Sequence, residues 1–121
     1  MRKSQLASLL ISALLISGLL TGCASTAPTT FYRPANYSGE PYRISGTLSP
    51  MSGWNGVVEI TINDQVVINK PLPVFSNTID ATGSYNGKKV TATITKVINF
   101  TSSYHRADVF IGSEKAATLT F

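Results

Sequence analysis

Hydrophobic and polar residues alternate along most of the chain after Pro41, a pattern typical of β-strands that bury one face. Thr, Val, Ile and aromatic residues are plentiful there, and no window shows sustained helical spacing. The stretch 42–48 illustrates the alternation, and one of its faces holds Tyr42, Ile44, Gly46 and Leu48. We therefore predict that residues 42–121 form one all-β domain, a small antiparallel β-sandwich or barrel of about seven strands.

The strongest hairpin signal is Asn86-Gly87, between strands predicted over 78–85 and 88–98. A two-residue type I′ turn needs positive φ at both central positions, which Asn and Gly tolerate. Counting outward from this turn sorts the facing residues into an apolar and a polar set. The apolar pairs are Ile79 with Ile94, Ala81 with Ala92 and Gly83 with Val90; the polar pairs are Thr78 with Thr95, Asp80 with Thr93, Thr82 with Thr91 and Ser84 with Lys89.

Two further hairpins are predicted, over 57–70 and over 104–121. In both, a loop of three residues matches the apolar faces of the two strands better than a loop of two. The loops are then 63–65 and 112–114. The expected pairs are Ile62 with Val66, Ile60 with Ile68, Glu59 with Asn69, Val109 with Ala117 and Ala107 with Leu119.

The stretch 23–41 has a different composition, with three prolines, a glycine and many small polar residues. Proline lacks an N–H donor and is excluded from helix interiors and central strands. We predict a flexible tether here. Phe31, Tyr32 and Tyr37 are unusual in a linker, and three roles are open for them: docking onto the domain, lying at a membrane surface, or binding a partner.

The first residues have the layout of a secretory signal peptide. Arg2 and Lys3 precede an uncharged run from Leu6 to Leu20, rich in Leu, Ile, Ala and Ser. This run is shorter than the ~20 apolar residues that a membrane-spanning helix needs.

The end of that run, Leu20-Thr21-Gly22-Cys23, resembles the lipobox of bacterial lipoproteins. The resemblance implies cleavage between Gly22 and Cys23, removal of residues 1–22, and a diacylglyceryl group on the Cys23 thiol with a further acyl chain on its amine. Two or more acyl chains give stable anchoring, at about 0.8 kcal/mol per buried CH₂. The Ala24-Ser25 that follows lacks the Asp that retains enterobacterial members at the inner membrane. We therefore expect a lipid-anchored outer-membrane protein that faces the periplasm, with no cofactor besides the lipid.

The charge and the cysteine content of the chain argue against nucleic-acid binding and against a disulfide in the domain. Removing Arg2 and Lys3 from the ten basic side chains leaves eight against six acidic ones, so the mature chain carries a net charge of +2. Its basic residues are scattered, without the run or stripe that nucleic-acid binding uses, and we expect no nucleic-acid partner. Cys23 is the only cysteine, so the domain has no disulfide.

The sequence offers little catalytic chemistry. His105 is the only histidine, and no Gly-x-Ser-x-Gly turn or glycine-rich phosphate loop is present. Arg106 and Asp108 are two residues apart, which on a strand makes them neighbours on one face. We interpret 104–108 as an exposed strand and predict no catalytic residue and no metal site.

The function that best fits these observations is binding. Trp54 lies in the turn-rich stretch 49–56, and aromatic residues on such loops often anchor partners; packing over the end of the core is the other interpretation. With Tyr32 and Tyr37, Trp54 is a candidate for contact with an envelope protein. The alternatives are a cell-wall or carbohydrate binding module and, with the least support, an envelope hydrolase.

Overall fold

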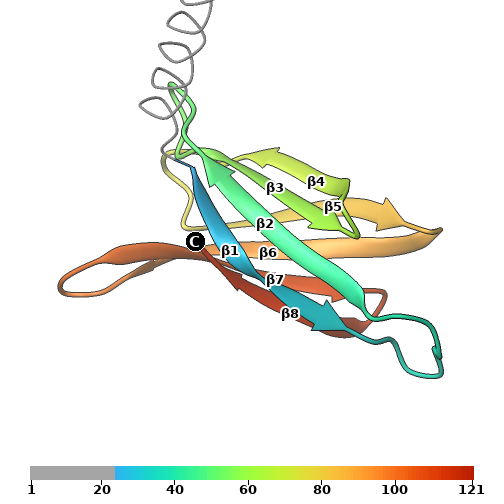
Figure 1. Ribbon diagram of the computed structural model, residues 1–121. Coiled ribbons are helices and arrows are strands. Elements are labelled where there is room, and N and C mark those ends of the chain that lie inside the picture. The colour runs from blue at the N-terminus through green and yellow to red at the C-terminus, as the bar shows by residue number, and fades with distance from the viewer. Residues whose placement is uncertain (1–23) are drawn as a thin grey trace, which may run out of the picture.

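The computed structural model describes residues 24–121 as two packed antiparallel sheets (Figure 1). The first sheet contains β1 (Ser25–Tyr32), β2 (Tyr42–Ser49), β3 (Val57–Ile62) and β4 (Gln65–Pro71), in that order. The second contains β5 (Thr78–Tyr85), β6 (Lys88–Ile98), β7 (Ser103–Ile111) and β8 (Glu114–Thr120), also in chain order.

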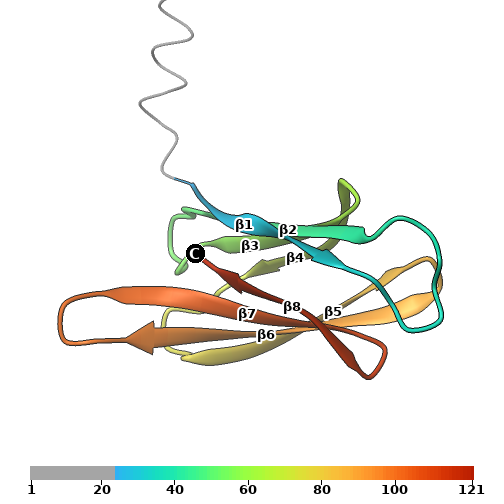
Figure 2. The same cartoon turned by 60° about the horizontal axis from the view of Figure 1, so that its bottom comes forward.

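These sheets confirm the all-β prediction. Of the two predicted architectures, sandwich and barrel, the structure is a sandwich, since neither sheet closes into a barrel (Figure 2). The described residues form eight strands, one more than expected. At one side of the sandwich β8 runs beside β1, and at the other side β5 contacts β4. The two sheets therefore contact each other along their edge strands.

The β5–β6 hairpin has the register predicted from its turn. All seven predicted pairs are present, from Thr78 opposite Thr95 to Ser84 opposite Lys89. Asn86 and Gly87 have φ values of 49° and 77°, as a type I′ turn requires.

The other two hairpins have the expected strand pairs but different turns. Ile60 faces Ile68, and Val109 faces Ala117, as predicted. Each turn, however, contains two residues rather than three, and a one-residue bulge restores the matching of the faces. The extra residues are Val67 in β4 and Ala116 in β8, and Ile62 consequently faces Gln65 instead of Val66.

The prediction of a tether over 23–41 was wrong for residues 25–32, which form β1 and pair with β2. Pro28 lies where the register shifts by one residue between Ala27 and Thr30. An edge strand tolerates a proline at such a bulge because no neighbour needs its missing N–H. Residues 33–41 connect β1 to β2.

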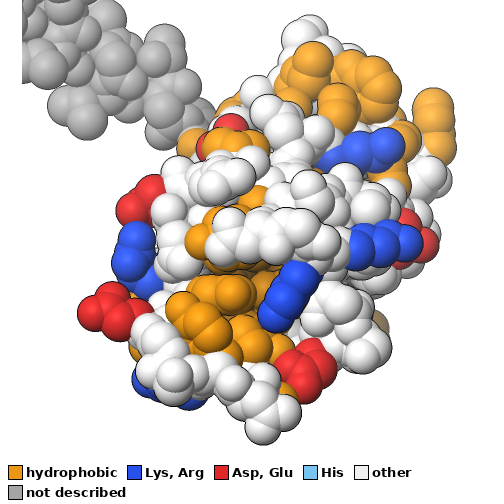
Figure 3. Space-filling model, turned by 90° about the vertical axis from the view of Figure 1, so that its right-hand side faces the viewer, with side chains coloured by type: hydrophobic (Ala, Val, Ile, Leu, Met, Phe, Trp, Pro, Cys, Tyr) orange, Lys and Arg blue, Asp and Glu red, His pale blue; other side chains and the backbone are white. Residues whose placement is uncertain are grey.

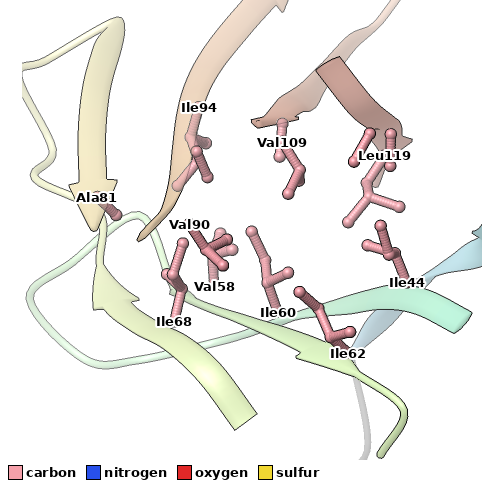
Figure 4. Close-up of a cluster of buried hydrophobic side chains, with 14 of the residues drawn as sticks. Ile44, Val58, Ile60, Ile62, Ile68, Ala81, Val90, Ile94, Val109 and Leu119 are labelled. Atoms are coloured by element: carbon pink, nitrogen blue, oxygen red, sulfur yellow. The ribbon is translucent and has the colours of Figure 1, made fainter. Parts of the chain in front are cut away.

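The core lies between the two sheets and consists mainly of aliphatic side chains, to which every strand contributes (Figure 4). The contribution of β1 is Ala27 alone. Its largest fully buried members are Ile44, Ile60, Ile62, Ile94, Leu119, Val58, Val90 and Val109. Because these residues alternate with exposed polar ones along each strand, each sheet presents one apolar face to the other.

The strand directions sort the connections onto two ends of the sandwich. The N-terminal end holds Ser25, where β1 begins, together with the loops 50–56, 72–77 and 99–102 (Figures 1 and 2, left). The distal end holds the connection 33–41 and the turns 63–64, 86–87 and 112–113. Within residues 24–121 no helix has the length and apolarity needed to cross a membrane.

Candidate functional site

The lipidation site predicted at Gly22 and Cys23 lies outside the described residues. What the structure places is the chain immediately after it: β1 begins at Ser25, which pairs with Leu48. Two residues span at most about 7 Å. A lipid on Cys23 would therefore be close to the N-terminal end of the sandwich, with no long linker between them.

Tyrosines gather at the distal end. The Tyr42 ring is buried at the centre of the group, with ring centroids 6.4 Å from Tyr32, 5.4 Å from Tyr37 and 5.3 Å from Tyr85. All three pairs are tilted or edge-to-face, the arrangements that aromatic quadrupoles favour. Tyr32 and Tyr37 thus dock onto the domain, which was one of the three roles open for them.

A polar network holds the β3–β4 turn against these rings. The Nδ2 group of Asn63 donates a hydrogen bond to the Tyr85 hydroxyl (2.9 Å), and its Oδ1 accepts one from the backbone N–H of Arg43 (2.9 Å). The Arg43 guanidinium also pairs with Asp64 at 2.9 Å. Asn63 and Asp64 have positive φ, a conformation that these residue types tolerate better than most.

A shallow depression lies beside the tyrosines, between the 33–41 connection and the β7–β8 turn. Tyr32, Lys88, Ile111 and Glu114 line it, together with Pro34 and Ala35. The Tyr32 hydroxyl donates a hydrogen bond to the Glu114 carboxylate, which raises the Tyr32 pKa to about 12, with smaller contributions from burial and from the nearby negative charge. Figure 3 looks onto this end and shows hydrophobic side chains with charged ones around them.

This hydrogen bond should be visible in a pH titration. A free tyrosine has a pKa of about 10 and is mostly ionised at pH 11, whereas we expect Tyr32 to remain mostly protonated there because its pKa is about 12. A raised folded-state pKa stabilises the fold below about pH 10, and this contribution is lost as the pH rises through 12. The NMR shift of the Tyr32 ring Cζ against pH measures it.

The matched variant is Glu114→Gln, which removes the charge and keeps the side-chain length. Its Tyr32 pKa should return toward 10. An unchanged titration of Tyr32 in this variant would contradict the assignment of the hydrogen bond.

Trp54 lies at the opposite end of the sandwich from the tyrosines. Its side chain is 44 % exposed and it is not part of the core, which disfavours packing over the core as its role. The three residues singled out as partner-binding candidates therefore do not form one site: Tyr32 and Tyr37 belong to the distal end, and Trp54 to the N-terminal end.

The sequence interpretation missed a group of apolar residues that accompany Trp54. Phe75 is 97 % exposed and Phe100 is completely exposed. The full set at the N-terminal end is Met51, Trp54, Val74, Phe75, Ile98 and Phe100. The sequence did show large apolar residues inside turn-forming stretches, and this signal could have identified them. That these residues lie at the same end of the sandwich follows only from the order and direction of the strands.

His105 and Asp108 do not form a catalytic pair, because they lie on opposite faces of β7. The His105 side chain faces inward, beside a cavity of about 10 Å³ that is large enough for one water-sized sphere. Burial, and after it the Lys96 charge, lowers the His105 pKa, so the imidazole is neutral at pH 7.

Asp108 points outward and belongs to a small ion network. Its carboxylate is 3.1 Å from Lys115 Nζ and 3.4 Å from Arg106 Nε, which confirms that Arg106 and Asp108 are neighbours on one face. Partial burial raises the Asp108 pKa, but Lys115, Arg106 and a hydrogen bond from Thr118 together bring it below its usual value. These residues form an ion network on the surface of the sheet, in which the Asp108 carboxylate already contacts Lys115, Arg106 and Thr118.

Within residues 24–121, no group of three or more His, Cys, Asp and Glu side chains is arranged to hold a metal ion. No protein-family model matches the sequence, and comparisons with curated proteins and with solved structures find no match. Hypotheses about function therefore rest on the residues of this chain.

Proposed function

We propose that this chain is an outer-membrane lipoprotein, anchored through Cys23, whose all-β domain binds another envelope protein and is not an enzyme. The anchor rests on the lipobox Leu20-Thr21-Gly22-Cys23 and on the signal-peptide layout before it. Anchoring raises the effective concentration of the domain toward a partner on the same membrane without any additional contact.

The observation that carries the binding function is the composition of the distal end. There, Tyr37 is partly exposed beside buried Tyr42, and a depression is lined by Tyr32, Lys88 and Glu114. Aromatic side chains on a packed base, with charged groups at the rim, are the features that protein interfaces favour. With the lipid at the other end of the sandwich, this surface would face the periplasm.

The anchor is tested by growing cells with radiolabelled palmitate. The wild-type protein should incorporate label, and Cys23→Ala should lose essentially all of it, because the acceptor thiol and the cleavage site are both removed. Equal labelling of the two proteins, or none in either, would refute the lipid anchor.

The binding surface is tested by placing a photo-crosslinking amino acid at position 37. In membranes, this protein should form one defined crosslinked product, whereas the same group at Thr82, exposed on the outer face of β5, should not. Co-sedimentation with peptidoglycan in place of a protein product would favour the cell-wall module. Substrate turnover that His105→Ala abolishes would instead support a hydrolase.

A further inference from the structure

Six of the nine large apolar residues that are exposed within residues 24–121 lie in or beside the loops of the N-terminal end. Its three loops, 50–56, 72–77 and 99–102, hold or flank every member of the set Met51, Trp54, Val74, Phe75, Ile98 and Phe100. Single exposed apolar residues are normal on a soluble protein, but several of them on the loops of one end favour contact with a protein or a membrane there.

Charge distinguishes this end from the other. None of the residues in loops 50–56, 72–77 and 99–102 is Lys, Arg, Asp or Glu. The distal connections contain or adjoin Arg33, Glu40, Asp64, Lys88 and Glu114. One end of the domain is thus suited to water, and the other to an environment in which charges are costly.

The position of the start of β1 favours a membrane over other apolar surroundings for these loops. Ser25 lines a small depression with Pro50 and Asn55, so the loop that carries Trp54 lies next to the start of β1. Since Cys23 is two residues away, its acyl chains would enter the bilayer within about 7 Å of this point along the chain. The same end then holds the lipid and the uncharged apolar loops.

We propose that the loops 50–56, 72–77 and 99–102 insert their apolar side chains into the lipid interface and fix the orientation of the domain on the membrane. This rests on the lipid anchor proposed above, and it adds a second contact that the lipid alone does not imply. Amphipathic helices bury their apolar face about 5–10 Å into the lipid interface, where tryptophan is enriched, and we expect these apolar loops to reach a similar depth. The Trp54 side chain is therefore expected among the lipid glycerol and upper acyl groups.

Trp54 is the only tryptophan of the chain and reports its own depth. The full lipidated protein, checked by mass, is reconstituted into phosphatidylethanolamine–phosphatidylglycerol vesicles with or without brominated acyl chains. We expect its emission to shift to shorter wavelength and to lose most of its intensity with brominated lipid. In the double variant Phe75→Asp, Phe100→Asp, quenching should fall markedly, because two charges are placed in the interface.

The matched control is Val66→Asp, an exposed apolar position at the distal end, which should quench like the wild type. Protein that floats with the vesicles but keeps an unquenched, water-accessible Trp54 would overturn this proposal and leave the anchor intact. Short-wavelength emission without quenching would also overturn it and would assign the apolar end to contact with a second copy of this chain. Failure to float would refute the anchor and, with it, the insertion of the loops.

Discussion

Replacing Gly83 with alanine is expected to lower the free energy of unfolding by about 1–3 kcal/mol, the usual cost of forcing an extra group into a packed interior. Gly83 lies in β5 where that strand passes β4. A Cβ atom at this position would overlap the backbone carbonyl oxygen of Val67 and lie 2.9 Å from its carbon. Backbone atoms cannot rotate away as a side chain can, so the edges of the two sheets would have to separate. Urea unfolding followed by circular dichroism measures the loss.

Thr82→Ala is the control for this prediction, since Thr82 is adjacent in β5 and faces outward. It should change the free energy of unfolding by no more than about 0.5 kcal/mol. Where a site has room, Gly→Ala stabilises by about 0.4–1 kcal/mol because it restricts the unfolded chain. A neutral or stabilising Gly83→Ala would therefore contradict the close approach of β4 and β5.

Ile60→Ala should be at least as damaging, with a loss of about 2–5 kcal/mol in the free energy of unfolding. Ile60 is fully buried in β3, between Gly46 on β2 and Ile68 on β4. Truncation removes buried methyl groups and leaves a cavity that two rigid sheets cannot easily close. The free energy of unfolding of a single domain is only about 5–15 kcal/mol in total, so the variant should unfold at a clearly lower temperature than the wild type.

Val66→Ala is the corresponding control in the neighbouring strand, because the Val66 side chain is 50 % exposed. It should shift the unfolding midpoint only slightly. Equal destabilisation by the two variants would contradict the burial of Ile60 in the core.

The hairpins show which parts of the fold can be predicted from residue patterns. Asn86-Gly87 specifies both the turn type and the register, so the entire β5–β6 hairpin followed from two residues. Around Asn63-Asp64, a three-residue loop and a two-residue turn with a bulge produce the same pairing of Ile60 with Ile68. Alternation of faces cannot distinguish them, although Asn-Asp is itself compatible with the positive φ of a type I′ turn.

β1 was missed for a different physical reason. Pro28 excludes a central strand, and that exclusion is correct. Whether such a segment becomes an edge strand depends on the partner available, here the exposed edge of β2, and this is a tertiary property. All three bulges lie on the edge strands β1, β4 and β8, each of which pairs with only one other strand of its sheet, so a bulge disturbs a single ladder.

The candidate site shows the same limit. Trp54, Tyr32 and Tyr37 could be selected by residue type, but their separation onto two ends depends on strand direction. The sequence gives no indication that Phe75 and Phe100 belong to a common surface, because each lies in a different turn. Only the topology brings the loops that carry them to the end where β1 begins.

The order of the strands has a consequence for how the chain folds. Each sheet is a meander in which every strand pairs with its neighbour in sequence, and six of the seven connections that join the strands return within the same sheet. The strand pairs therefore have low sequence separation, and hairpins of this kind form within about 1–10 μs. Low contact order accelerates folding, so this sandwich is expected to fold faster than sandwiches of similar size whose neighbouring strands are distant in the chain. The docking of the two preformed meanders, which brings β1 beside β8, is then the slow, non-local step.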